Sequence, residues 1–352
     1  MCPTFERSRP MSPTPVAILG ATGMVGQRMV ALLSAHPGFQ IAAVAASERS
    51  AGKTFADATN WVLEGDCPTS VADMMVRSCG PDAMPGGVRI ALSAMDAQPA
   101  GPIEAAFRDA GWAVVTNASA HRQDDDIPLI VPEVNPDHLS LLDRQGPGCI
   151  VANPNCCAIP LALSLAPLHE RWGVTAVCVS TWQAVSGAGY PGESAWDMVG
   201  SVHPHAGAEE AKLAIEPLKI LGGVDAPAQF PISARCVRVP VADGHLLGVQ
   251  VRLEGSPSAA AVAAAMAEWQ GNGPELHMCP RPPLRITTRR HRPSPRHDIG
   301  AGGGMAVTVG RIEECDVMGV KFFALGHNTI RGAAGAAIAN AELLLKMGRV
   351  PP

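Results

Sequence analysis

The chain has 352 residues, 47% of them hydrophobic and 17% charged, a size and composition typical of a well-buried globular enzyme with two domains. Its net charge of -5 argues against a nucleic-acid partner, and no apolar run reaches the roughly 18 residues of a membrane span. The ten cysteines have no CxxC spacing, so we expect neither a metal site nor a disulfide framework, and reduced thiols indicate a cytoplasmic protein.

The N-terminal segment, residues 1–14, lacks the apolar core of a signal peptide, and we expect a disordered tail. A short apolar strand over 16–19 follows, then a glycine-rich turn over 20–26 and a helix over 27–33. This order is typical of dinucleotide binding, in which the phosphates lie on the helix N-terminus. The spacing is GxxGxxG rather than GxGxxG, so the position of the turn supports the prediction more than the motif does. The cofactor contacts expected here are Gly20, Thr22, Gly23, Met24, Val25 and Gly26.

The second strand, over 40–45, ends in a polar turn that bears on which cofactor is bound. An NAD enzyme usually has a carboxylate here for the ribose 2′-hydroxyl, and Glu48 is such a carboxylate. Ser47, Arg49 and Ser50 surround it, however, and an arginine with hydroxyl groups suits a 2′-phosphate. We therefore predict NADP, with the alternative that Glu48 binds ribose and Arg49 is a solvated charge.

Strands over 88–92 and 113–116, with a helix over 103–110 between them, continue the doubly wound alternation of strand and helix. The loop that follows contains Arg122 and, shortly after it, three aspartates. Such a loop is ordinarily solvated. The planar guanidinium of Arg122 nonetheless suits a phosphate or carboxylate, which makes it a candidate anion ligand.

The stretch over 151–160, VANPNCCAIP, carries the strongest candidate for nucleophilic chemistry. An apolar strand ends at its start and an apolar segment of helical length, 159–168, begins near its end, which places Cys156 and Cys157 in the turn between them. Backbone N–H groups and the helix dipole favour an anion at such a position and make thiolate formation easier. The alternative is that both cysteines are small buried hydrophobes, and this stretch alone gives either sulfur an equal claim to be the nucleophile.

After this turn a β-rich run over 174–181 indicates a second domain with an antiparallel sheet, and a glycine-rich, uncharged loop over 183–192 follows. The helix over 209–221 begins with charged residues that are typical of a solvated face. Arg238 lies in a strand-like run and His245 follows a turn, so both could face one cleft. An isolated histidine is more often structural, but a nucleophilic cysteine needs a base within reach, and this favours a role for His245.

The last third of the chain begins with six arginines among prolines over 281–296, which we interpret as an exposed loop or an oligomer contact. Strands over 305–311 and 320–325 and an alanine-rich helix over 333–346 complete the chain. So many small residues imply tight packing of this helix on a sheet or on another subunit, and we expect it to return to the nucleotide-binding domain. The helix and the arginine-rich segment together favour a homodimer or homotetramer.

Eight short motifs occur in one order along the chain: GATGMVGQR, AASERSAGK, NASAHRQDDDIPLIVPEVNPDHL, ANPNCCAIPL, QAVSGAGYPG, EEAK, RVPVADGH and HNTIRGAAGA. Together they resemble the aspartate-β-semialdehyde dehydrogenase family, specifically its archaeal and fungal branch. The resemblance implies an α/β fold with a Rossmann-type, doubly wound NADP-binding domain formed by 15–154 and 327–352. It also implies an α+β catalytic and oligomerisation domain with a mixed or antiparallel sheet, formed by 155–326.

The resemblance implies a reaction as well: the NADPH-dependent reductive dephosphorylation of L-aspartyl-4-phosphate to L-aspartate-4-semialdehyde, in lysine, threonine and methionine biosynthesis. Cys156 would expel inorganic phosphate and carry the acyl group as a thioester, His245 would be the acid and base, and Gln183 would orient the intermediate. The implied substrate contacts are Arg238 for the α-carboxylate, Glu209 for the α-ammonium, and Arg122, Asn155 and Lys212 for phosphate. The further implied cofactor contacts are Ser93, Ser186, Gly187 and Asn328.

Three departures from the family pattern lie around the expected substrate. Cys157 occupies a position usually held by threonine, Leu246 follows His245 where threonine is common, and the flanks of two motifs differ. These differences bear on the identity of the substrate rather than on the class of reaction. One alternative is a paralogous reductase of another acyl phosphate or of a short acyl-CoA. A second is a non-catalytic NADP-binding protein, which would be expected to lack Cys156, His245 or Arg238.

Overall fold

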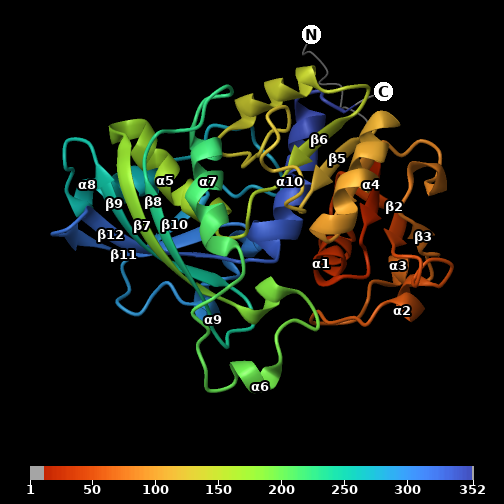
Figure 1. The fold of residues 1–352 in the computed structure, drawn as a ribbon, viewed down its shortest axis with the longest axis horizontal. Helices are drawn as coiled ribbons and strands as arrows, with labels where there is room; N and C mark the ends of the chain where they lie inside the picture. The colour runs from red at the N-terminus through yellow and green to blue at the C-terminus, as the bar shows by residue number, and fades with distance from the viewer. Residues whose placement is uncertain (1–11, 351–352) are drawn as a thin grey trace, which may run out of the picture.

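The computed structural model describes residues 12–350, and two six-stranded sheets organise them (Figure 1). Residues 1–11 of the predicted tail lie outside the described part of the chain, and the first strand already begins at Thr14. Within 12–350, no helix combines the length and the hydrophobicity that crossing a membrane requires.

The first sheet is parallel throughout, and apolar strands that are buried over most of their length form its centre. Its strand order is β3 (Arg77–Ser78), β2 (Phe39–Ala46), β1 (Thr14–Leu19), β4 (Ile90–Ser93), β5 (Ala113–Thr116) and β6 (Cys149–Ala152). The helices that pack on it are α1 (Met24–Leu33), α4 (Ala97–Asp109) and α10 (Gly335–Lys346). This is the doubly wound arrangement that the sequence predicts.

The second sheet is mixed. Its strand order is β10 (Leu284–Thr287), β11 (Val307–Cys315), β12 (Gly319–Gly326), β9 (His245–Leu253), β7 (Val174–Gln183) and β8 (Ile232–Arg238). The outer pairs β10–β11 and β7–β8 are parallel, and the inner pairs are antiparallel. The helices against it are α5 (Ala158–Trp172), α7 (Glu209–Leu221) and α8 (Ala259–Glu268). The predicted α/β class with a mixed second sheet is thus confirmed.

The short elements lie mostly in the connections between these layers. The short helices are α2 (Phe55–Ala58), α3 (Thr69–Ala72), α6 (Ala195–Met198) and α9 (Pro295–Asp298). The 3₁₀ turns are Pro81–Ala83, Pro136–Arg144, Val185–Ala188 and Ala301–Gly304, and Ile330–Ala334 is a π-turn. Helix α6 stands away from both sheets, at the bottom of Figure 1.

The alanine-rich helix α10 packs on α1, β4 and β5 of the first sheet, although the chain reaches it directly from the second sheet. Ala336, Ala337 and Ala341 are buried in this contact. Their small side chains allow the close approach, so the alanines serve packing of a helix on a sheet. The side chain of Asn340 donates to that of Asn153, which links α10 to the turn that carries the cysteines.

The segment over 281–296, which we expected to be an exposed loop or an oligomer contact, has mostly exposed arginines but also contains a strand. Strand β10 lies within it and pairs with β11, and Leu284 of this strand is fully buried. Arg292 forms an ion pair with Asp298 of α9. The segment is therefore part of the edge of the second sheet. The apolar residues between the arginines indicate this strand, but we gave more weight to the density of charge.

Candidate active site

The cysteine turn connects β6 to α5, at the edge where the first sheet meets the helices of the second. Cys156 is partly exposed, whereas Cys157 is fully buried at the N-cap of α5. The Oδ1 atom of Asn155 accepts the backbone N–H of Cys157 at 2.9 Å, which closes the turn. The helix N-terminus therefore begins at the residue after Cys156, where its dipole favours an anion.

His245, the first residue of β9, lies fully buried beside the two thiols. A ring nitrogen of His245 and the sulfurs of Cys156 and Cys157 lie within 4.8 Å of one another. The backbone N–H of Ala184 donates to Nδ1 of the ring at 3.1 Å, so the neutral ring carries its proton on Nε2. Nε2 has no hydrogen-bond partner among the described residues. The ring is thus fixed as an N–H donor.

The two sulfurs differ in acidity. The hydrogen bond from the thiol of Cys157, together with the neighbouring His245, holds the pKa of Cys156 well below its usual range, although burial alone raises it. Burial first, and then the bond to Cys156, raise the pKa of Cys157 well above its usual range. These opposite directions favour the thiolate on Cys156, the cysteine that the family resemblance names as the nucleophile.

Helix α7 presents three charged residues to this turn, at a spacing that places them on one helix face. Glu209 accepts Nδ2 of Asn155 at 2.8 Å and Nζ of Lys212 at 2.8 Å. Glu216 accepts the backbone N–H of Asn155 and, at 3.0 Å, Nη1 of Arg122. We interpreted the head of this helix as a solvated face, but the structure turns it toward the cysteines.

Glu216 was missed in the sequence, although it lies seven residues after Glu209 and therefore on the same face. Burial raises its pKa, against the lowering effects of Arg122 and the N–H of Asn155. Burial also acts to raise the pKa of Glu209, but the bonds from Lys212 and Asn155 outweigh it and leave that pKa below its usual range. The two carboxylates therefore sit in opposite electrostatic environments on one helix.

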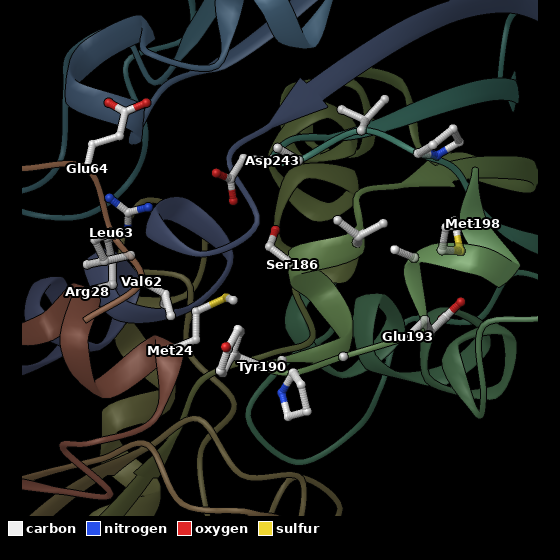
Figure 2. Close-up of a pocket in the computed structure, with 18 of the residues that line it drawn as sticks. Met24, Arg28, Val62, Leu63, Glu64, Ser186, Tyr190, Glu193, Met198 and Asp243 are labelled. Carbon is white, nitrogen blue, oxygen red and sulfur yellow. The ribbon is translucent and has the colours of Figure 1, made fainter. Parts of the chain in front are cut away.

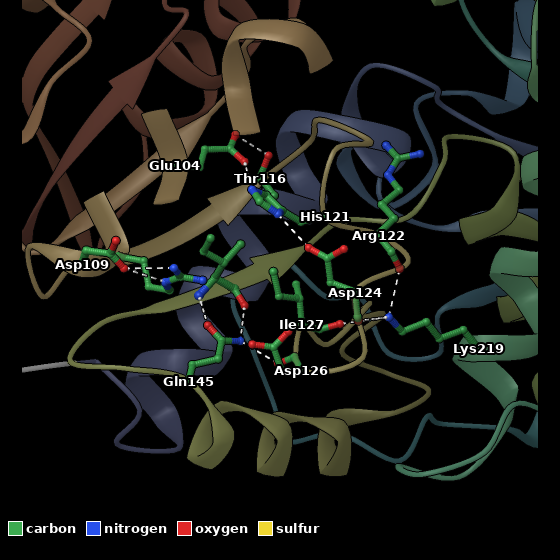
Figure 3. Close-up of polar contacts among 12 residues, drawn as sticks. Glu104, Asp109, Thr116, His121, Arg122, Asp124, Asp126, Ile127, Gln145 and Lys219 are labelled. Atoms are coloured by element: carbon green, nitrogen blue, oxygen red, sulfur yellow. Dashed lines mark hydrogen bonds and ion pairs between the residues drawn. The ribbon is translucent and has the colours of Figure 1, made fainter. Parts of the chain in front are cut away.

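Arg122 is buried, although Asp124 and Asp125, which follow it closely, are exposed. Nζ of Lys219 donates to the backbone carbonyls of Arg122, Asp124 and Ile127 at 2.9, 2.8 and 3.0 Å, which ties the loop to α7 (Figure 3). Nη2 of Arg122 donates to the carbonyl of Asn117 at 2.7 Å, while its Nε–H has no partner among the described residues. The expected solvated loop thus carries one inward-facing guanidinium.

Gln183 and Arg238 end the neighbouring strands β7 and β8 and lie opposite each other in the parallel register. Nη1 of Arg238 donates to Oε1 of Gln183 at 3.1 Å and to the carbonyl of Ala184 at 3.0 Å. The glycine-rich loop covers them so closely that a Cβ on Gly187 would lie 2.7 Å from Arg238 and 3.0 Å from His245. The structure therefore brings all the residues predicted for catalysis and substrate binding to one region.

A cavity of about 590 Å³ lies at the N-terminus of α1 and fits a dinucleotide cofactor. It is lined by Gly20, Thr22, Gly23, Met24, Val25, Ser47, Glu48 and Arg49 among others. Helix α1 begins at Met24, three residues before the predicted start, so Gly26 lies within its first turn. A Cβ on Gly26 would lie 2.3 Å from the carbonyl oxygen of Gly20, which makes glycine necessary for the close packing of turn and helix.

A second cavity, of about 620 Å³, adjoins the first at Met24 and Tyr190 and extends toward the second sheet (Figure 2). Ser186 lines it, and Oγ of Ser186 accepts Nδ2 of Asn328 at 2.8 Å. Five other predicted cofactor contacts are not among the lining residues of either cavity: Gly26, Ser50, Ser93, Gly187 and Asn328. Ser93 is fully buried at the end of β4. The remaining eight predicted cofactor residues line the two adjoining cavities.

Comparisons with known proteins agree with this geometry. The family model of the semialdehyde dehydrogenase NAD-binding domain matches residues 15–142, and that of the semialdehyde dehydrogenase dimerisation domain matches 165–331. The aspartate-semialdehyde dehydrogenase of Methanothermobacter thermautotrophicus is 44% identical over 94% of this chain and 98% of that protein. The enzyme of that name from Schizosaccharomyces pombe is 40% identical over 95% of this chain and 98% of its own length.

The structural comparison gives the same result. The crystal structure of aspartate-semialdehyde dehydrogenase with NADP from Candida albicans superimposes with a TM-score of 0.89 at 37% identity. The match covers 96% of this chain and all of that one. The resemblance carried by the eight motifs is confirmed. The chain therefore belongs to the semialdehyde dehydrogenase family, as an aspartate-semialdehyde dehydrogenase that uses a nicotinamide cofactor and has the dimerisation domain of that family.

Proposed function

We propose that this enzyme reduces L-aspartyl-4-phosphate to L-aspartate-4-semialdehyde with NADPH, releasing inorganic phosphate, in lysine, threonine and methionine biosynthesis. The observation that carries the proposal concerns the sulfur of Cys156, which lies in the turn before α5 and within 4.8 Å of a ring nitrogen of His245, a position that favours a thiolate. The sulfur lies beside the N–H of His245 and the polar groups presented by α7. We also propose that it works as a cytoplasmic homodimer or homotetramer, in keeping with its free cysteines and its dimerisation domain.

In the first half-reaction the sulfur of Cys156 forms a bond to the acyl carbon, and the carbon–oxygen bond to phosphate breaks. A thiolate attacks without losing a proton, so no base is required at this step. His245 faces the sulfur with its Nε2–H, because the N–H of Ala184 occupies Nδ1. At this step His245 acts as a hydrogen-bond donor to the thiolate and to the oxygen that becomes negative, and it remains the acid and base proposed from the family resemblance.

The phosphate leaves toward a group of cationic and N–H donors on one side of the cysteine turn. Nζ of Lys212 and the amide of Asn155 share one carboxylate, Glu209, which holds both beside the turn. Arg122 has a buried Nε–H without a partner among the described residues, a donor available to an anion. These groups stabilise the dianion as the thioester forms.

The remaining substrate groups are held by residues at the ends of the two neighbouring strands. Arg238 binds the α-carboxylate and Gln183 orients the acyl group. A hydrogen bond of 3.1 Å between the two side chains keeps these contacts at a fixed separation. The carboxylate of Glu209, ionised because its pKa is lowered, faces the α-ammonium. The reacting carbon is thereby fixed between the sulfur and the histidine.

The cofactor proposed for the two adjoining cavities is NADP. When bound, NADPH supplies the hydride that reduces the thioester. Arg49 and Ser47 line the cavity at the end of β2, where a 2′-phosphate would be held. The crystal structure of the Candida albicans enzyme with NADP supports the proposal of NADP as the cofactor. The Nε2–H of His245 then stabilises the oxyanion until it collapses and releases the thiolate of Cys156 with the aldehyde.

The experiment that tests the proposal follows reduction of NADP by aspartate-semialdehyde with phosphate or coenzyme A as the acyl acceptor. We expect turnover that depends on phosphate and is absent with coenzyme A. Turnover with coenzyme A and none with phosphate would replace the proposal by the acyl-CoA reductase alternative. Turnover with neither acceptor would exclude both functions.

A further inference from the structure

The guanidinium of Arg238 already binds a carboxylate of its own chain. Oε1 of Glu193 accepts its Nε–H at 3.2 Å, and the side chain of Arg238 is only 6% exposed. Its Nη1 group is occupied by Gln183 and by the carbonyl of Ala184. A carboxylate binds a guanidinium with two hydrogen bonds along one edge, here the edge formed by Nε and Nη2. Glu193 occupies one end of that edge.

Glu193 has a second partner, a histidine, on its other side. Its Oε2 lies 3.1 Å from Nδ1 of His203, whose Nε2 lies 2.9 Å from the carbonyl of Asp197. Backbone hydrogen bonds of 3.0 and 2.8 Å join His203 to Arg238 itself, so the two partners of Glu193 keep a fixed separation. Glu193 thus holds both partners at once, and a rotation of its side chain that breaks the contact with Arg238 can keep the one with His203.

The cavity in Figure 2 provides room for this rotation. Glu193 lines it together with Tyr190 and Met198, and its side chain is 28% exposed. The start of this segment is anchored to the first domain, because Nδ2 of Asn60 donates to Oη of Tyr190 at 2.9 Å. The carboxylate of Glu193 therefore faces an open cavity rather than a packed interior.

We propose that Glu193 is an internal competitor that occupies Arg238 until a substrate α-carboxylate displaces it toward His203. The proposal rests on the assignment of Arg238 to that carboxylate in the proposed function. A substrate that carries the carboxylate forms two bonds to the guanidinium and replaces the single bond of Glu193. A compound without a carboxylate leaves Glu193 in place and forms no bond to the guanidinium of Arg238. Glu193 therefore keeps the buried guanidinium paired in the free enzyme and lowers the affinity of the site for an α-carboxylate.

A purely structural role for Glu193 predicts the opposite sign. If its bond served to hold Arg238 in the productive orientation, its removal would weaken the binding of carboxylate ligands. Competition instead predicts that neutralising Glu193 strengthens that binding. One substitution therefore separates the two roles.

The test uses Glu193→Gln, which keeps the shape of the side chain and removes its charge. Binding of L-2-aminobutyrate, which has the α-carboxylate and α-ammonium but no reactive carbonyl, is measured by calorimetry on the full-length protein. We expect its affinity to rise about 3- to 10-fold, the range of a partly exposed ion pair. Propylamine, the same molecule without its carboxylate, should bind with unchanged affinity. Glu64→Gln, which removes a carboxylate from the opposite wall of the same cavity, is the matched control.

Unchanged or weaker binding of L-2-aminobutyrate to Glu193→Gln overturns the inference. An equal gain for propylamine overturns it as well, because the effect would then not depend on the carboxylate. The KM for aspartate-semialdehyde should fall in parallel with the gain in aminobutyrate affinity. If the wild-type enzyme does not turn over this aldehyde with phosphate, the proposed function fails while the calorimetry still decides the role of Glu193.

Discussion

Replacing Cys157 by alanine should make Cys156 a weaker nucleophile without touching it directly. The thiol of Cys157 is the largest of the influences that hold the pKa of Cys156 low, and alanine removes that hydrogen bond while leaving the buried site apolar. Hydrogen bonds to charged groups contribute about 1.5–3 kcal/mol, and an S–H group is a weak donor, so the lower end applies. That value corresponds to about a tenfold smaller thiolate fraction at any pH below the pKa.

The assay is the rate of alkylation of Cys156 by iodoacetamide across a pH series, with the modified peptide identified by mass spectrometry. The midpoint of the profile should move to higher pH in Cys157→Ala, and the rate below it should fall about tenfold. Cys157→Thr, which restores a hydroxyl donor, should recover most of the loss. An unchanged midpoint in the alanine variant would refute the role assigned to Cys157, and so would a threonine variant no better than alanine.

Three further substitutions test other parts of the site. Gly187→Ala should lower kcat/KM about 100-fold in steady-state assays, because the added Cβ would lie 2.7 Å from Arg238 and displace its side chain. Wild-type activity of this variant would show that Arg238 can move aside without loss of function. Arg49→Ala should raise the KM for NADPH about 10- to 100-fold and leave that for NADH unchanged, whereas an equal rise for both would show that Arg49 does not distinguish the 2′-phosphate. Glu216→Ala should lower the free energy of unfolding by about 3–5 kcal/mol in urea titrations, since it leaves a buried guanidinium unpaired, and no change would mean that the pair is not maintained in solution.

The elements of the first sheet were predictable because their signals are local. Apolar strands, a glycine turn and an alanine-rich helix each identify themselves within a few residues. The predicted helix boundaries were less accurate where a helix contains a residue that usually disfavours helix formation. Gly26 lies inside α1 because close packing on the turn requires it, and Pro102 lies inside α4 although proline commonly ends a helix.

The site could be predicted only in part, because much of it depends on contacts between residues that are far apart in the sequence. The motifs named Cys156 and His245, but nothing local shows that the N–H of Ala184 fixes the histidine tautomer. Nothing local shows the contact of Glu193 with Arg238 either, because 45 residues separate them. Such contacts follow from the fold rather than from any one stretch of sequence.

The central claim is that Cys156 carries the acyl group, and trapping that intermediate tests it most directly. The enzyme is mixed with aspartate-semialdehyde and NADP in the absence of phosphate, and the formation of NADPH is followed together with the mass of the digested protein. We predict about one NADPH per active site, an aspartyl group on the peptide that contains Cys156, and further turnover when phosphate is added. No burst of NADPH, or an acyl group on Cys157 or on another residue, would contradict the account.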